Sequence, residues 1–150
     1  SSYVSIKREY KLVQKVEMKG GFREELVPFK GVVHSGDEIQ VSLKVKSNDP
    51  LEYLIIEDYI PAGCEIVNRE SGKTWYSHQE FHDEKAVFFI TKFWWYSSRK
   101  EREFVYRLRA EVPGKFKILP AIVTSMYFPE VYGNTSSSHI TILEKKSLKE

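Results

Sequence analysis

The sequence predicts an all-β domain, an antiparallel β-sandwich with little or no helix. Apolar and polar residues alternate along several segments, which is typical of strands with one face on a core. Turn-forming residues recur at intervals of about 8–15 residues, as in sandwiches and barrels. Aromatic residues make up 14% of the chain, and such side chains favour pleated, half-buried surfaces.

The expected strands can be justified in chain order. Near the start, apolar residues of one parity indicate a strand that Arg8 interrupts: Val4, Ile6, Tyr10 and Leu12. Residues 37–46 alternate cleanly, with Ile39, Val41, Leu43 and Val45 on one face. Residues 53–60 and 86–96 are apolar runs of strand length, typical of more deeply buried strands. Residues 103–112 and 138–144 alternate again. In residues 103–112 the predicted core face is Phe104, Tyr106, Leu108, Ala110 and Val112.

The composition is that of a globular chain. Among 150 residues, 23 are basic and 21 acidic, and 41% are hydrophobic. This balance argues against disorder and against nucleic-acid binding through bulk charge. No apolar run reaches the roughly 18 residues of a membrane helix, so no direct membrane insertion is expected. No signal peptide is expected within the chain either. We expect residues 1–150 to form a single domain.

Motifs for chemistry are weak. Glu80, His82, Asp83 and Glu84 form the densest group of possible ligands, but zinc needs three or four converging donors. We interpret this group as the charged end of a hairpin. Cys64 is expected to be a small core residue rather than a nucleophile. The sequence therefore predicts no catalytic residue, no metal site, no cofactor and no enzymatic activity.

A second interpretation rests on the aromatic run at residues 93–96. Aromatic side chains beside cations can stack on sugars or on unpaired bases. Strand alternation sends Trp94 and Trp95 to opposite faces, which favours a core role. The alternative function is a generic cell-surface β-sandwich module, such as a stalk, an adhesin or a carbohydrate-binding module.

Three stretches in order carry a resemblance to a known family. They are residues 53–65, with Glu57, Asp58, Pro61 and Gly63; residues 75–89, with a Trp-Tyr-Ser-His-Gln-Glu segment; and residues 104–133, with Arg107, Arg109, Pro113, Gly114 and Gly133. The match covers nearly the whole chain and resembles the C-terminal macroglobulin-like domain of bacterial α2-macroglobulins. Tyr59-Ile60 and Asn134-Thr135 depart from the pattern of the family without touching the core pattern.

The resemblance implies a macroglobulin or fibronectin-III-like sandwich within a much larger periplasmic or cell-envelope protein that traps proteases. In that family an internal thioester captures the attacking protease, and it lies in a Cys-x-Glu-Gln motif of another domain. Here Cys64-Glu65 continues as Ile66-Val67, so this chain lacks the motif. The implied partners are other domains of the parent protein, above all the thioester domain, and proteases that meet the full-length protein.

One segment is the best candidate for shielding the thioester. A thioester survives only while water and amines are excluded, so its cover should be bulky and apolar. Met126, Tyr127, Phe128 and Pro129 supply such side chains, and we expect Glu130 with the Gly133 turn to fix the loop. The alternative is that this segment only closes the edge of the sandwich itself.

Overall fold

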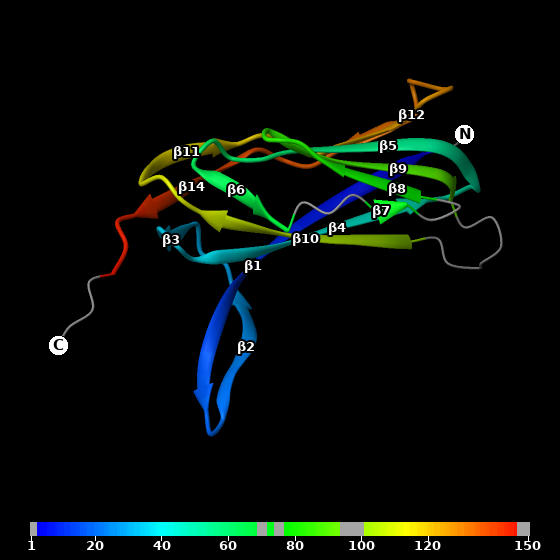
Figure 1. Ribbon diagram of the computed structural model, residues 1–150. Helices are drawn as coiled ribbons and strands as arrows, with labels where there is room; N and C mark the ends of the chain where they lie inside the picture. The colour runs from blue at the N-terminus through cyan, green and yellow to red at the C-terminus, as the bar shows by residue number, and fades with distance from the viewer. Residues whose placement is uncertain (1–2, 69–71, 74–76, 94–100, 147–150) are drawn as a thin grey trace.

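The computed structural model describes residues 3–68, 72–73, 77–93 and 101–146, and Figure 1 shows their arrangement. These residues form strands joined by turns and contain no helix, so the predicted all-β class is confirmed. It follows that no helix in this part of the chain is long and apolar enough to span a membrane.

The first sheet has five antiparallel strands in the order β2-β1-β4-β10-β6. β4 lies at its centre and pairs Val41 with Tyr10 of β1 on one side and with Tyr106 of β10 on the other. The two tyrosines therefore share one face of the sheet. The strand bounds are β1 Val4–Met18, β2 Gly21–Pro28, β4 Glu38–Ser47, β6 Cys64–Val67 and β10 Glu101–Ala110.

Two further sheets complete the structure (Figure 1). The six-stranded sheet has the order β13-β12-β5-β9-β8-β7, with β5 Leu51–Tyr59, β7 Gly72–Lys73, β8 Ser77–Phe81, β9 Lys85–Phe93, β12 Ile122–Ser125 and β13 Tyr132–Asn134. The three-stranded sheet has the order β11-β14-β3, with β3 Val32–His34, β11 Gly114–Ile118 and β14 Ser138–Leu143. β14 and β3 run parallel, which departs from an otherwise antiparallel pattern.

The alternating segments supply the core between the sheets. In β4 the four predicted residues Ile39, Val41, Leu43 and Val45 are at most 1% exposed. Phe88 of β9 is fully buried and packs against rings from β8 and β10: Phe81, Phe104 and Tyr106. The predicted parity is therefore confirmed for these four residues of β4 and for Tyr106 of β10.

The prediction for Val112 is wrong. Its side chain is 55% exposed because β10 ends at Ala110. Beyond that residue, the N–H groups of Glu111 and Val112 both donate to the carbonyl of Gly63, which turns the backbone out of the strand. The predicted aromatic run continues into Trp94 and Trp95, which lie outside the described residues.

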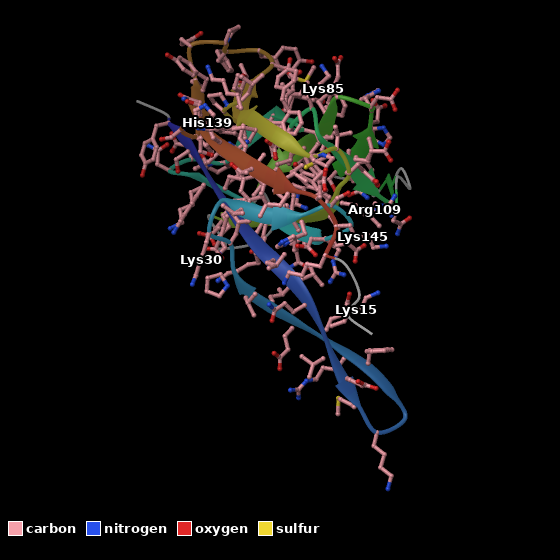
Figure 2. All side chains as sticks on the ribbon, turned by 90° about the vertical axis from the view of Figure 1, so that its left-hand side faces the viewer. Lys15, Lys30, Lys85, Arg109, His139 and Lys145 are labelled. Atoms are coloured by element: carbon pink, nitrogen blue, oxygen red, sulfur yellow. The ribbon has the colours of Figure 1, made fainter. Side chains whose placement is uncertain are left out.

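β1 and β2 continue past the sandwich as a two-stranded ribbon, on which Lys15 lies (Figure 2). β1 pairs with β4 only as far as Val13, whereas its pairing with β2 runs to Met18. An ion pair of 2.8 Å between Glu24 of β2 and Arg107 of β10 ties the ribbon to the main sheet.

Candidate domain-contact site

The loop between β12 and β13 carries the predicted shielding segment. Met126, Tyr127 and Phe128 are 51%, 68% and 58% exposed. Pro129 and Glu130 are exposed as well. Figure 1 shows the loop at the same end of the molecule as the N-terminus. Large apolar side chains that lie bare and contiguous are typical of interaction surfaces.

Backbone hydrogen bonds and Ser125 hold this loop in shape. The N–H of Ser125 donates to the carbonyl of Val131 at 2.9 Å, and the N–H of Val131 donates to the carbonyl of Phe128 at 2.8 Å. The side-chain oxygen of Ser125, a residue only 1% exposed, accepts the N–H of Phe128 at 3.2 Å. The loop is thus closed on itself, and its apolar side chains are exposed, with no cover from the described part of the chain.

Further aromatic side chains extend the surface. The rings of Tyr53 and Tyr127 meet edge to face, with centroids 5.0 Å apart. Tyr132 at the start of β13 is 60% exposed. We call these side chains together the aromatic face: Tyr53, Met126, Tyr127, Phe128 and Tyr132. Sequence reasoning missed Tyr53 and Tyr132, because neither lies in the segment that the resemblance singled out for shielding.

Gly133 places β13 against the first strand. A Cβ at this position would lie 2.7 Å from the carbonyl oxygen of Val4 and 3.2 Å from the Cα of Ser5. Only a glycine allows the two backbones to approach so closely. The family-motif glycine therefore fixes where the strand after the loop lies.

A buried ion pair links the sheets. Arg8 of β1 donates to Asp58 of β5 at 2.5 Å, and the side chains are 4% and 0% exposed. Arg8 also donates to the carbonyl of Leu119 at 2.8 Å, and the hydroxyl of Tyr106 donates to Asp58. Burial raises the pKa of Asp58 above its ordinary value, while Arg8 and the Tyr106 hydrogen bond act in the opposite direction.

This cluster explains the interrupted parity of the first strand. Arg8 lies on the inward face of β1, opposite Leu43, because its guanidinium is the counter-ion of Asp58. The buried hydroxyl of Tyr10 has no hydrogen-bond partner among the residues that the structure describes, and burial raises the pKa of this tyrosine strongly. The sequence signal for the cluster was the charged residue at an inward position, which by itself names no partner.

Other family-motif residues support turns and ion pairs at the surface. Pro61 is buried, and its carbonyl accepts the N–H of Cys64 at 2.9 Å. A Cβ on Gly63 would overlap the ring of Phe116. Pro113 and Gly114 form the exposed turn into β11. Partly exposed pairs join Lys85 to Glu57 at 2.9 Å and Arg109 to Glu111 at 2.5 Å.

Cys64 is buried, with 6% of its surface exposed. Burial, followed by the nearby charge of Glu111, raises the pKa of its thiol to about 11 from an ordinary 9.0. Because the thiolate is the nucleophilic form, this raised pKa makes the thiol of Cys64 a poor nucleophile near neutral pH. The structure therefore agrees with a core role for this residue.

We expect Cys64 in the native chain to react with iodoacetamide at pH 8 at least ~100-fold more slowly than in the urea-unfolded chain, because the thiolate is the nucleophile. Mass spectrometry of timed aliquots measures both rates. The unfolded chain at the same pH is the control. A native rate within ~10-fold of the unfolded rate would contradict the burial and raised pKa of this thiol.

The charged hairpin end forms as interpreted. The N–H of His82 donates to the carbonyl of Lys85 at 2.9 Å, which closes the turn between β8 and β9. Glu80 interacts with His78 at 2.9 Å and with His82 at 3.4 Å. Within the described ranges, no group of three or more His, Cys, Asp or Glu residues is placed to hold a metal ion.

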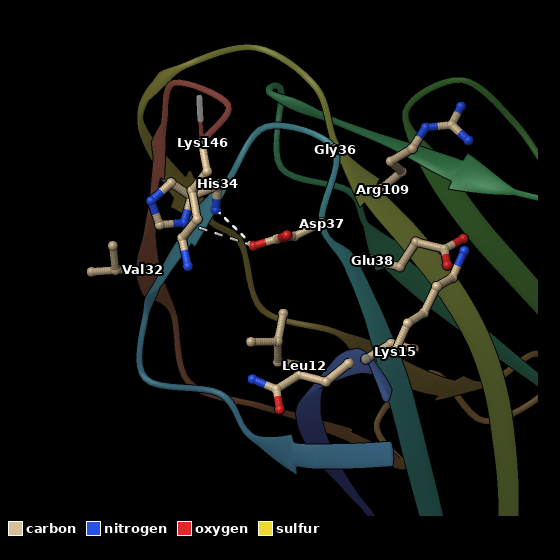
Figure 3. Close-up of a pocket in the computed structure, with 11 residues that line it drawn as sticks. Leu12, Lys15, Val32, His34, Gly36, Asp37, Glu38, Arg109 and Lys146 are labelled. Atoms are coloured by element: carbon tan, nitrogen blue, oxygen red, sulfur yellow. Dashed lines mark hydrogen bonds and ion pairs between the residues drawn. The ribbon is translucent and has the colours of Figure 1, made fainter. Parts of the chain in front are cut away.

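A pocket lies beside β3 and β4, and Figure 3 shows its lining. The backbone N–H of His34 donates to Asp37 at 2.9 Å there. The lining mixes cations with carboxylates: Lys15, Arg109 and Lys146 with Asp37 and Glu38. This mixture favours no particular class of charged ligand, so we place the candidate site at the aromatic face.

Comparison with known proteins bears on the family and the fold of the chain. The family described as "Bacterial Alpha-2-macroglobulin MG10 domain" matches residues 4–130. An alpha-2-macroglobulin of Thermotoga maritima is 29% identical over an alignment of 119 residues, and the match covers 69% of this chain and 7% of that protein. One of Xylella fastidiosa is 25% identical over an alignment of 132 residues, and the match covers 75% of this chain and 8% of that protein. The chain thus spans less than a tenth of the length of these curated relatives.

Solved structures show the same fold. Native alpha-2-macroglobulin of Escherichia coli, from domain MG7 to the C-terminus, matches with a TM-score of 0.69 and 21% identity, over 93% of this chain and 23% of that one. The Salmonella protein reacted with methylamine matches with a TM-score of 0.70 and 20% identity, over 93% of this chain and 9% of that one. The Escherichia coli protein activated by porcine elastase matches with 0.71 and 22%, over 93% and 13%.

Proposed function

Because this chain belongs to the bacterial alpha-2-macroglobulin MG10 domain family, we propose that it is a non-catalytic C-terminal domain of a protease-trapping inhibitor. Its role is to pack on the thioester domain of the parent protein and to shield the thioester. The observation that carries the proposal is the aromatic face, where Tyr127 is 68% exposed on a loop closed by its own hydrogen bonds.

The physical argument is exclusion of water and amines. A thioester is hydrolysed or aminolysed when small nucleophiles reach it, so a protecting surface must be apolar and well ordered. The aromatic face meets both requirements: its rings are bare in this chain, and Ser125 and backbone groups hold the loop beneath them. A neighbouring domain seated there would bury these rings and close the path to solvent.

The descriptions of two relatives support the proposed role in a protease-trapping inhibitor. The Salmonella protein has been solved after reaction with methylamine, and the Escherichia coli protein after activation by elastase. We extend to the parent of this chain the response to amines and proteases that these descriptions indicate. Cys64 is the only cysteine of the chain and is buried, so a thioester of the parent would come from another domain.

We place the parent protein in the periplasm or cell envelope, where it would meet proteases from outside. Its partners there are its own other domains and the attacking protease. In this proposal the chain supplies no reactive group of its own. It covers the thioester that another domain carries.

The test is Tyr127→Gly in the full-length parent protein. Removing the exposed ring opens the cover, so we expect methylamine to be incorporated several-fold faster than in the wild type. Mass spectrometry follows the incorporation at fixed amine concentration. Phe22→Gly, which removes a 71% exposed ring from the distant β1–β2 ribbon, is the matched control and should keep the wild-type rate. An unchanged rate of methylamine incorporation in Tyr127→Gly would contradict the shielding role.

The alternative function is a cell-surface binding module. Its candidate stacking residues Trp75 and Trp94 lie outside the described residues. A glycan array with the 150-residue chain separates the two functions, because sugar binding is expected of the module and not of the cover. Binding of glycans that compete with one another for the chain would favour the cell-surface binding module.

A further inference from the structure

We infer that Tyr53 is a positioning residue for Tyr127. The position of the shielding ring of Tyr127 is then fixed by β5 as well as by the loop that carries it. This inference rests on the proposed function and deepens it. It starts from an unusual backbone conformation. Tyr53 has a φ of +57°, in the left-handed region, where a bulky side chain is strained.

The strained residue interrupts the pairing of β5 with β9. Glu52 pairs with Lys92 and Leu54 pairs with Ile90 on β9, whereas Tyr53 between them pairs with no described residue of β9. On the other side, the last pair between β12 and β5 joins Ser125 to Leu54. Tyr53 is therefore the first residue beyond the end of that ladder, beside the start of the loop.

Both halves of Tyr53 contact the loop. Its carbonyl accepts the N–H of Met126 at 2.8 Å, and its ring meets that of Tyr127 edge to face, with centroids 5.0 Å apart and an interplanar angle of 79°. The turned backbone thus aims the carbonyl and the ring at adjacent residues of the same loop. Edge-to-face pairs contribute beyond the area they bury, and this pair constrains a ring that is otherwise two-thirds exposed.

If the backbone geometry alone mattered, a residue that tolerates a positive φ would fit position 53 better than a tyrosine. Asn68, the other non-glycine residue with positive φ in the described part of the chain, is of a type that tolerates this region. A tyrosine does not share that tolerance, so its ring is the feature that the site uses. Strain of this kind is found where a side chain must be held in place for function.

The experiment separates the ring from the backbone. Tyr53→Asn accepts the left-handed conformation but has no ring, and Tyr53→Phe keeps the ring. In the full-length parent we expect Tyr53→Asn to speed methylamine incorporation about two- to tenfold, the factor expected for loss of one aromatic pair. Tyr53→Phe should restore a rate near that of the wild type. Phe22→Asn removes a 71% exposed ring from the distant β1–β2 ribbon and should change nothing.

A second readout uses the 150-residue chain. We expect the NMR order parameters of the amides of Met126 to Phe128 to fall in Tyr53→Asn while those of β4 stay constant. A merely structural role would lower stability without this local loss of order.

The outcomes distinguish the two proposals. If Tyr127→Gly incorporates methylamine faster than the wild type while Tyr53→Asn incorporates it at the wild-type rate, the positioning role of Tyr53 is wrong and the shielding role of Tyr127 is supported. If Tyr127→Gly is unchanged, the cover is wrong, and the order parameters alone decide whether Tyr53 positions the loop. Unchanged order in Tyr53→Asn overturns the inference in either case.

Discussion

Arg8→Met is expected to lower the free energy of unfolding by about 3–5 kcal/mol at pH 7. The substitution keeps a long side chain but removes the guanidinium that donates to Asp58 at 2.5 Å. Asp58 has no exposed surface, so its carboxylate would stay buried with only the hydroxyl of Tyr106 as the remaining donor among the described contacts. An uncompensated buried charge is far costlier than the loss of the pair itself.

The deficit should depend on pH. Burial already raises the pKa of Asp58, and Arg8 is the largest opposing influence. Without Arg8 the pKa of the folded carboxyl rises further above its unfolded value. The folded variant then binds the proton more tightly than the unfolded chain, so its stability falls as pH rises through the folded pKa. We therefore expect the deficit relative to wild type to be smaller at pH 4 than at pH 7.

Urea denaturation followed by tyrosine and tryptophan fluorescence at both pH values measures this difference. Arg8→Met combined with Asp58→Leu is the control, because replacing both charges with apolar groups should recover most of the loss. A loss below about 1 kcal/mol at pH 7, or an equal loss at the two pH values, would show that the pair does not stabilise the fold as its burial indicates.

Gly133→Ala is expected to destabilise the chain by about 1–3 kcal/mol, through overpacking. The new Cβ would lie 2.7 Å from the carbonyl oxygen of Val4, and the obstacle is backbone rather than a movable side chain. β13 and β1 must move apart, and the loop before β13 must follow. Thermal unfolding measured by circular dichroism reports the change as a lower Tm.

Tyr132→Ala is the matched control for this prediction. It alters the neighbouring residue, whose side chain is 60% exposed, and should shift stability by no more than about 0.5 kcal/mol. If Gly133→Ala and Tyr132→Ala have equal Tm values, the close approach of β13 to β1 does not constrain the fold.

Much of the fold could be predicted from local pattern. Alternation along β4 identified its four core residues because side-chain direction in a strand has a period of two. The same rule failed at Val112, since a pattern does not reveal where a strand ends. There the end was decided by the carbonyl of Gly63, almost fifty residues away in sequence, accepting two N–H groups.

The candidate site divides in the same way. Its loop, Met126 to Glu130, was found from the resemblance and from its run of bulky apolar residues. Tyr53 was not found, because neither its positive φ nor its contact with Tyr127 can be predicted from the neighbouring residues in the sequence. Arg8 stood out as a charge at an inward position, yet only the structure paired it with Asp58 on another sheet.

The sequence by itself therefore determined the all-β class, the family and the inward-facing residues of β4 and of β10 up to Ala110, because each of these follows from side-chain type and spacing along the chain. The tertiary structure alone decided which distant residues meet: Arg8 with Asp58, Gly133 with Val4, and Tyr53 with Tyr127. These contacts depend on how strands far apart in sequence are ordered and registered in the sheets. That order is set by the packing of all strands together and not by any one segment.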